Sequence, residues 1–382
     1  SNATSFTVVK NPTPMTIEVT NSTVGSIEQI NVTVPNGVTG QILLDIDGQH
    51  YYANVTAGVA QFNITGLEAG EHKFNVTYVG NYKYLANSTK ASLEVSKLNT
   101  TMAITVTDID NIHYGDSVNI TVTITSGATG YITVRINETR TVTLPIVAGK
   151  VNWILSGLGA NNYTVYANYS GDGKYNINNT DKVNKSFEVE KADPNLKFVA
   201  FSGTVFETGT IQATINNETY VGTVKITVGD DEYTADIKAD GTIELTTVVF
   251  DEYKEYDITI EYGGNANFTS VKLDNIKVTP KKVTNYGINI TAMNITVGDE
   301  EIITVEVPNH VNDVVIWVSG TSFRNQSATG FKDNKATFNV TGLNLKAGVY
   351  IVTATVNDTE FEHTNFTALF TVSKTYPSMN IT

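Results

Sequence analysis

Residues 163–175 read YTVYANYSGDGKY, and this stretch decides the fold. Every second residue from Tyr163 to Tyr169 is apolar or aromatic, which is the period of a β-strand with one face on a core and the other in water. Gly171-Asp172-Gly173 follows, and these residue types tolerate the positive φ angles of a tight hairpin turn. Tyr175 opens the next apolar run. The stretch predicts two antiparallel strands joined by a short turn.

The same strand and turn return in three other places. Equivalent strands begin at His72, Tyr256 and Tyr350. Each unit closes with an alternating strand that ends in lysine, and these lysines recur roughly every ninety residues, a period typical of tandem domains. They are Lys97, Lys191, Lys281 and Lys374. The period predicts four domains, at residues 4–97, 98–191, 192–281 and 282–374, and the start of a further repeat at 375–382.

Other landmarks repeat in the same order. A Gly precedes an alternating strand in each unit, at Val24-Gly25, Tyr114-Gly115, Thr208-Gly209 and Val297-Gly298. Trp153 aligns with Phe62 and Phe338 on the inward phase of its strand, so we expect its ring in the core. About seven short strands in each unit, with no helical period, predict a β-sandwich. Because the linkers are short, we expect the four sandwiches to form an extended rod.

The landmarks together resemble a known family. They read Val297-Gly298-Asp299, Thr341-Gly342-Leu343, Ala347-Gly348-Val349-Tyr350, Tyr169-Ser170-Gly171-Asp172-Gly173-Lys174-Tyr175 and Phe370-Thr371-Val372-Ser373-Lys374. This order resembles the bacterial-type immunoglobulin-like repeats of large surface proteins. With so much Asn and Thr, it is most similar to adhesin-like proteins of methanogenic archaea. The third repeat departs most, because Val248-Val249-Phe250 stands where Thr-Gly-Leu is expected. The resemblance implies an all-β tandem array of four immunoglobulin-like domains, extracellular display at the cell wall or envelope, and no catalytic residues or cofactor.

Charge and composition exclude several classes of protein. The 382 residues carry a net charge of −14 without any basic run, so nucleic-acid binding is disfavoured. No apolar run reaches the roughly 18 residues of a membrane span, so we expect no membrane insertion. There is no cysteine, hence no disulfide and no thiol ligand for a metal. We treat Ser1-Asn2-Ala3 as an expression-tag remnant and expect a monomer.

Asn-x-Ser/Thr sequons are the commonest motif, with about 22 beyond the tag. Two explanations stay open. The Asn residues can carry N-linked glycans outside the cell, or they can coat the sheets because alternation points Asn31 and Thr33 outward around Val32. The glycosylation candidates that we single out are Asn31, Asn75, Asn119, Asn168, Asn217, Asn267, Asn294 and Asn357.

Acidic clusters are the only candidates for a metal. Asp108 and Asp110 lie near the first junction between repeats, where calcium would stiffen the chain. Two other clusters are Asp45-Ile46-Asp47-Gly48 and Asp230-Asp231-Glu232. Calcium takes six to eight oxygen ligands, and none of these clusters completes an EF-hand loop, so solvated turn carboxylates are the other interpretation. The histidines lack metal-ligand spacing, and His72 stands where other repeats have Tyr, so we expect it to do that residue's structural job.

Exposed aromatic residues are the candidates for ligand contact. The alternation of its strand points Trp317 outward, either under cover from its own chain or toward a ligand such as a sugar. Tyr51 and Tyr52 form a second aromatic candidate. We predict a non-enzymatic, adhesin-like surface protein whose repeats act as a stalk and take part in cell adhesion, with a cell-surface protein or glycan as partner. The alternatives are a carbohydrate-binding array and an accessory region of a larger extracellular enzyme.

Overall fold

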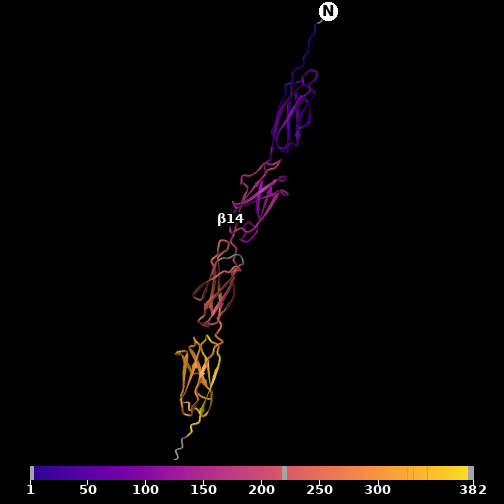
Figure 1. Cartoon of the computed structure of the whole chain (residues 1–382). Coiled ribbons are helices and arrows are strands. Elements are labelled where there is room, and N and C mark those ends of the chain that lie inside the picture. The colour runs from indigo at the N-terminus through magenta and orange to yellow at the C-terminus, as the bar shows by residue number, and fades with distance from the viewer. Residues whose placement is uncertain (1–3, 217–221, 325, 330, 342, 377–382) are drawn as a thin grey trace, which may run out of the picture. The chain divides into compact units, whose positions relative to one another are not determined.

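Alternating apolar residues form β-strands along the chain. The computed structural model describes residues 4–216, 222–324, 326–329, 331–341 and 343–376. All the regular secondary structure in these ranges is β-strand, which confirms the predicted all-β class (Figure 1). In the same part of the chain, no helix is long and apolar enough to span a bilayer. The tag residues 1–3 and most of the predicted further repeat at 375–382 lie outside the described residues.

The first repeat folds as two sheets with strand orders β1-β3-β6 and β2-β8-β7-β4-β5. Its strands are β1 (Thr16–Val19), β2 (Ser22–Thr23), β3 (Ile27–Thr33), β4 (Gln41–Ile46), β5 (Gln49–Asn54), β6 (Val59–Thr65), β7 (Gly70–Tyr78) and β8 (Asn87–Ser96). Neighbouring strands are antiparallel except β2, which runs parallel to β8. The last strand therefore pairs with one of the first.

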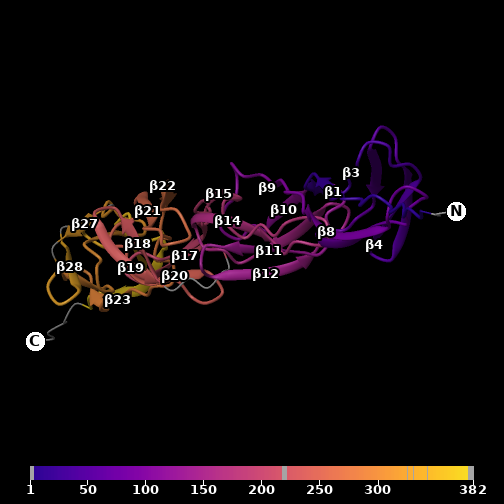
Figure 2. The same ribbon diagram turned by 90° about the horizontal axis from the view of Figure 1, so that it is seen from above.

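The second repeat has the same plan, with orders β13-β10-β9 and β12-β11-β14-β15. Its strands are β9 (Met102–Val106), β10 (Val118–Ile124), β11 (Tyr131–Ile136), β12 (Arg140–Pro145), β13 (Lys150–Leu155), β14 (Asn161–Tyr169) and β15 (Asn184–Val189). Figure 2 shows β11 and β12 side by side as an antiparallel hairpin. The strand predicted from Tyr163 and the turn after it are confirmed, since β14 ends at Tyr169 and the chain turns at Gly171, where φ is +74°. The predicted short hairpin is wrong, because Tyr175 forms only an isolated bridge to Leu98 and the next strand, β15, begins at Asn184.

The third repeat has the orders β16-β17-β20 and β19-β18-β21-β22. Its strands are β16 (Lys197–Ser202), β17 (Thr208–Thr214), β18 (Thr223–Val228), β19 (Asp231–Asp236), β20 (Thr242–Val249), β21 (Tyr256–Tyr262) and β22 (Val271–Val278). The register shifts between Gly209 and Ile211 where β17 pairs with β20, and again between β21 and β22. Such bulges bend a strand without ending its sheet.

The fourth repeat has the orders β23-β25-β28 and β24-β30-β29-β26-β27. Its strands are β23 (Asn289–Thr291), β24 (Ile295–Thr296), β25 (Glu301–Glu306), β26 (Asp313–Val318), β27 (Gln326–Thr329), β28 (Lys335–Val340), β29 (Gly348–Val356) and β30 (Phe366–Ser373). As in the first repeat, a short early strand, here β24, runs parallel to the last strand. The two end repeats thus share one topology.

Each sandwich encloses an apolar core between its two sheets. In the second repeat, Val134 and Val165 are fully buried, and the Trp153 ring packs against the same cluster from β13. This confirms the inward phase predicted for Trp153. By its contacts the chain divides into two compact units, residues 1–192 and 193–382, and each unit holds two sandwiches. Burial of a large apolar side chain contributes about 1.5–3 kcal/mol, so each core supplies the main stabilisation of its own sandwich.

One hydrogen bond recurs at the start of the penultimate strand. The Tyr163 hydroxyl donates to the carbonyl oxygen of Gly159, four residues earlier, at 3.0 Å. Tyr256 and Tyr350 donate to the carbonyl oxygens four residues before them at 3.2 and 3.0 Å. In the first repeat His72 Nε2 makes the same contact with Glu68 at 2.8 Å. The prediction that His72 does the structural job of the tyrosine is confirmed, and the arrangement is that of a tyrosine corner.

Two alignments predicted for the third repeat are wrong. In the first repeat the backbone N–H of Val24 donates to Ser96 O. In the third repeat the equivalent donor is Val205, which donates to Lys281 O, and not Thr208 as predicted. Phe206 therefore occupies the turn position of Gly25, and Gly209 lies inside β17. By the same contacts Lys281 matches Ser96, so Lys282 is the equivalent of Lys97. The pattern failed because glycine marks a left-handed turn in sequence, whereas here a phenylalanine adopts it.

Candidate functional site

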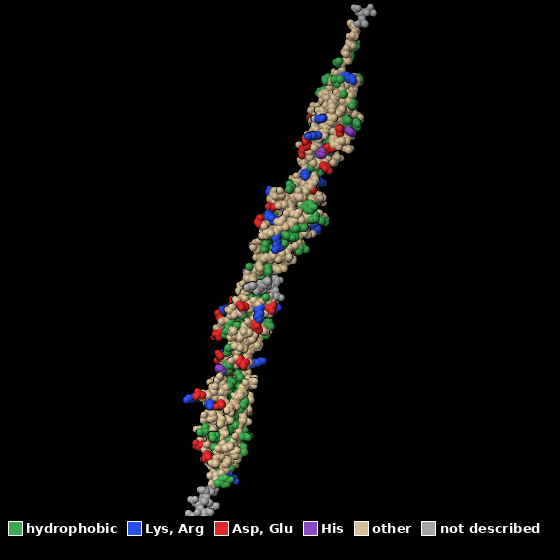
Figure 3. All heavy atoms as spheres, viewed as in Figure 1, with side chains coloured by type: hydrophobic (Ala, Val, Ile, Leu, Met, Phe, Trp, Pro, Cys, Tyr) green, Lys and Arg blue, Asp and Glu red, His purple; other side chains and the backbone are tan. Residues whose placement is uncertain are grey.

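The outer face of one sheet in the fourth repeat carries apolar side chains. Val349, Ile351 and Leu369 are 66%, 43% and 64% exposed. They come from β29 and β30, where Ile351 and Leu369 are directly paired across the strands. Hydrophobic side chains also appear on the surface of the fourth repeat in Figure 3. We call these three residues the repeat-4 apolar face.

The other repeats have polar residues at these positions. The pair Ile351–Leu369 corresponds to Lys73–Ser92 in the first repeat, Thr164–Ser186 in the second and Asp257–Lys277 in the third. A contiguous exposed apolar patch often marks a contact surface, because its exposure is unfavourable in water. This face was not predicted from the sequence, although Val349 and Ile351 have the opposite phase from Tyr350 and Val352 along the strand.

Trp317 borders this face. It pairs with Thr353 on β29, two residues from Ile351, on the outer side of β26. The outward phase predicted for Trp317 is thus confirmed, but its ring is half-buried. A sugar or peptide would therefore meet a partly covered indole.

The Tyr51–Tyr52 pair is not a joint aromatic site, contrary to the prediction. Neighbouring residues of β5 point to opposite faces of the sheet, as the period of a strand requires. Tyr51 packs against the core of the first repeat, and Tyr52 is 64% exposed opposite Leu43. Of the two tyrosines Tyr52 alone is exposed, and it belongs to a different unit from Trp317.

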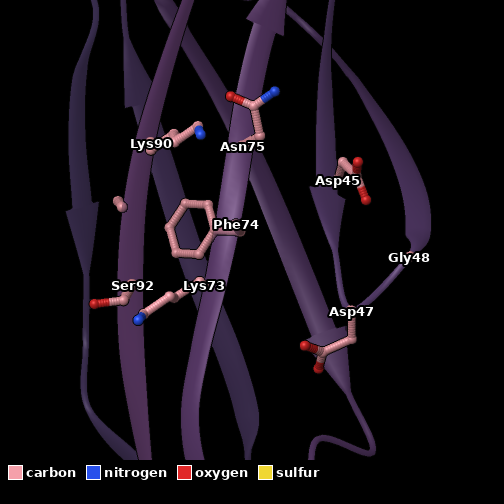
Figure 4. A pocket seen from close by; sticks show the side chains of 9 residues that line it. Asp45, Asp47, Gly48, Lys73, Phe74, Asn75, Lys90 and Ser92 are labelled. Carbon is pink, nitrogen blue, oxygen red and sulfur yellow. The ribbon is translucent and has the colours of Figure 1, made fainter.

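A polar groove of about 600 Å³ crosses the outer face of the first repeat. Asp45, Asn75 and Lys90 form one row across β4, β7 and β8, because Asn75 is paired with both of the others. Figure 4 shows the carboxylates of Asp45 and Asp47 on one side and the ammonium group of Lys90 on the other. The Ser88 hydroxyl donates to Asn75 Oδ1 at 2.9 Å. The groove offers both charges and no exposed aromatic ring.

One histidine at this end of the first repeat is tied to an acidic group. His72 Nδ1 lies 2.5 Å from Asp47 Oδ2, while its Nε2 contacts the Glu68 carbonyl. Burial opposes protonation, but the bonds to Glu68 and Asp47 outweigh it and raise the pKa of His72. When the imidazole is protonated, both of its nitrogens donate, which holds the corner and Asp47 together.

The calcium candidates do not gather into a ligand set. Asp108 and Asp110 are exposed on either side of Ile109, in a turn where Asp108 has a φ of +52°. Glu232, of a second cluster, pairs with the Lys225 ammonium group. Among the residues that the structure describes, no three His, Asp or Glu side chains lie together as metal ligands would. A carboxylate pair alone falls short of the six to eight oxygens that calcium takes.

The glycosylation candidates differ in how free their side chains are. Asn294 is exposed, and only its carbonyl oxygen is engaged, by Thr371 N–H at 2.7 Å. Asn168 donates its amide to Asp181 at 2.9 Å. The side-chain oxygen Oδ1 of Asn119 is buried without a hydrogen-bond partner.

The remaining candidates fall into three groups. Asn31, Asn75 and Asn267 are half-buried. Asn357 is exposed but donates its amide to Asp313 at 2.6 Å. Asn217 lies outside the described residues. Sequence reasoning treated all eight alike because a sequon carries no information on the neighbouring strand.

Comparison with known proteins agrees with this architecture. Residues 104–188, within the second repeat, match the bacterial Ig-like domain (group 3). No curated protein sequence matches the chain. With the two-sheet topology found in every repeat, the chain is a tandem array of immunoglobulin-like β-sandwiches.

Three solved structures illustrate the likeness. One is a Ca²⁺-stabilised adhesin with which an Antarctic bacterium binds ice, at 15% identity and a TM-score of 0.33, covering 96% of this chain and 100% of that one. Another is the ICAM-5 D1–D4 ectodomain fragment, at 10% identity and 0.33, covering 94% and 100%. The third is FdeC, an adhesin of Escherichia coli, at 14% identity and 0.24, covering 70% and 99%.

Proposed function

We propose that this chain is the repeat region of a non-enzymatic, extracellular surface protein of the adhesin type, similar to those of methanogenic archaea. Its sandwiches serve as a stalk that withstands pulling and take part in adhesion to a cell-surface protein or glycan. An acidic, Asn- and Thr-rich exterior keeps such a stalk hydrated and resists its collapse. The predicted extended rod is part of this proposal.

The observation that carries the proposal is the parallel pairing of early and last strands. It occurs as β2 with β8 and as β24 with β30 in the end repeats. The middle repeats have single parallel bridges at His113–Glu190 and Thr204–Lys281. A force applied at the two ends of a repeat loads a parallel pair along the strands, so its hydrogen bonds must break together rather than one by one.

The linkers support the same mechanism. Ser96 is still paired in the first repeat with Thr23, and Leu98 is already bridged to Tyr175 in the second, so Lys97 alone connects them. Its ammonium group donates to Asp172 O at 2.5 Å. So short a connection transmits force with little slack.

Force spectroscopy of the full chain tests this proposal. Pulling between the termini should give four separate unfolding events, each lengthening the chain by about 300 Å, as roughly ninety extended residues require. One event for the whole chain would refute independent repeats. Antibody labelling of intact cells then tests surface display, and small-angle scattering tests the extended rod. A chain detected only after cell lysis would contradict the surface location.

Carbohydrate binding is a second candidate, favoured by Trp317 beside the repeat-4 apolar face. Sugars commonly rest their apolar faces on aromatic side chains. Binding to a glycan array should fall at least tenfold in Trp317→Ala and remain unchanged in Tyr52→Ala, the matched surface-aromatic control. Equal loss in both variants, or no glycan bound by the parent chain, contradicts this role for Trp317.

A further inference from the structure

Phe206 adopts a backbone conformation that its side chain disfavours. Its φ is +67°, at the turn position where the other repeats have Gly25, Gly115 and Gly298, with φ of +88°, +96° and +101°. Glycine enters this region freely, whereas a bulky residue there is an outlier. The Phe206 backbone is held in place by its N–H, which donates to Phe250 O at 2.8 Å.

A second such replacement occurs in the fourth repeat. The backbone N–H groups of Val34, Ile124 and Val307 each donate an equivalent hydrogen bond to a carbonyl oxygen further along the repeat. These three residues therefore occupy the same position in their repeats, and so do the residues three positions after each of them. These are Gly37, Gly127 and His310. The two glycines have φ of +98° and +84°, and His310 has +68°. His310 is thus also a ring residue at a left-handed glycine position.

The two replacements meet. The rings of Phe206 and His310 stack at 4.2 Å between centroids and 9° between planes. Phe206 also approaches Phe361 at 6.0 Å and packs against the core of the fourth repeat. Between Lys281, bridged to Thr204, and Val283, bridged to Phe361, the linker is the single residue Lys282.

We infer that the Phe206–His310 stack is a clasp that holds the third and fourth repeats in one preferred orientation. Strained residues persist where surrounding contacts compensate for them, and here the compensating contact lies in the neighbouring repeat. At the junction of the first two repeats the same positions are Gly25 and Gly127, which have no side chains to stack. The clasp is specific to this one junction and does not depend on whether the chain is a stalk.

Pulsed dipolar spectroscopy on the full chain tests the clasp. Because the chain has no cysteine, spin labels can be placed at Asp236→Cys and Thr367→Cys, which are exposed sites in the third and fourth repeats. The parent chain should give a narrow distance distribution. Phe206→Gly and Phe206→Asn, which both suit the left-handed turn, should at least double its width.

Further variants separate ring stacking from other causes. His310→Phe retains a ring and should keep the narrow distribution, whereas His310→Gly should broaden it as Phe206→Gly does. Tyr82→Ala, which removes an exposed ring in the first repeat, should change nothing. Circular dichroism checks that each variant is folded, and removal of strain favours folding of the glycine variants. A width unchanged in both Phe206 variants, or broadened equally by His310→Phe, overturns the clasp.

Discussion

We expect Asp172 to make the second repeat less stable in acid, and Asp172→Asn to weaken that dependence on pH. Its carboxylate accepts hydrogen bonds from the backbone N–H groups of Thr129, Lys174 and Tyr175 at 2.8, 2.8 and 2.6 Å, and from the Thr129 hydroxyl at 3.0 Å. In the first repeat the same turn is closed by Asn81, which accepts from two backbone N–H groups at 2.8 Å and cannot titrate.

The direction of the effect follows from the pKa of Asp172. Burial by itself would raise it, but the hydrogen bonds from Thr129, Tyr175 and Lys174 hold the pKa well below its usual range. An unfolded Asp has a pKa near 3.9, so the unfolded chain binds the proton more tightly than the folded one. The stabilisation is therefore complete above about pH 5 and is lost as the pH falls through 4 and below.

The size of the effect follows from the bonds that change. A hydrogen bond to a buried charged group contributes about 1.5–3 kcal/mol, but Asp172 is half-exposed and water screens it, so about 2 kcal/mol is reasonable for the set of four. An Asn at this position keeps the two bonds that Asn81 makes. Asp172→Asn should thus lower the free energy of unfolding by about 1 kcal/mol at pH 7, and by much less at pH 3.

The two tryptophans allow the second repeat to be followed separately. In a Trp317→Phe background the remaining tryptophan is Trp153, which packs on the core of the second repeat. Urea unfolding by Trp153 fluorescence, at pH 7 and pH 3, compares this background with the same chain carrying Asp172→Asn. The background chain should lose more stability from pH 7 to pH 3 than the Asp172→Asn variant does. An equal loss in both chains would show that the charge of Asp172 does not cause it.

Three other predictions follow from single contacts. Tyr163→Phe removes the hydroxyl bond to Gly159 and should lower the unfolding free energy of the second repeat by about 1 kcal/mol in urea, so an unchanged midpoint would count against the corner. Burial raises the pKa of Glu301, so its carboxyl group binds a proton more tightly in the folded chain than in the unfolded chain. In calorimetry, Glu301→Gln should therefore stabilise the fourth repeat by about 1 kcal/mol at pH 7 and leave its stability unchanged at pH 4. A lower stability of the variant at both pH values would refute this. In a glycosylating host, peptide mapping should find glycans on Asn294 and not on Asn168, and the reverse pattern would be contrary evidence.

Local pattern was sufficient for the architecture of this chain. Alternation places alternate side chains on opposite faces, so the strand at Tyr163, the inward Trp153 and the outward Trp317 could all be predicted. Repetition of that pattern four times showed which residues do the same job, including His72 in place of tyrosine. These features depend on neighbours within a few positions, or on comparison of one repeat with the next.

Contacts between distant segments decided the rest. Glu28 and Glu301 are each 1% exposed although they are charged residue types, because the strands around them close over their side chains. Asn168 and Asn294 each begin a sequon, yet only Asn168 has an acidic partner for its side-chain amide. Phe206 adopts the conformation of a glycine because a ring in the next repeat compensates for its strain. A residue's phase is set by its neighbours in the chain, but its partners are set by which segments the fold brings beside it.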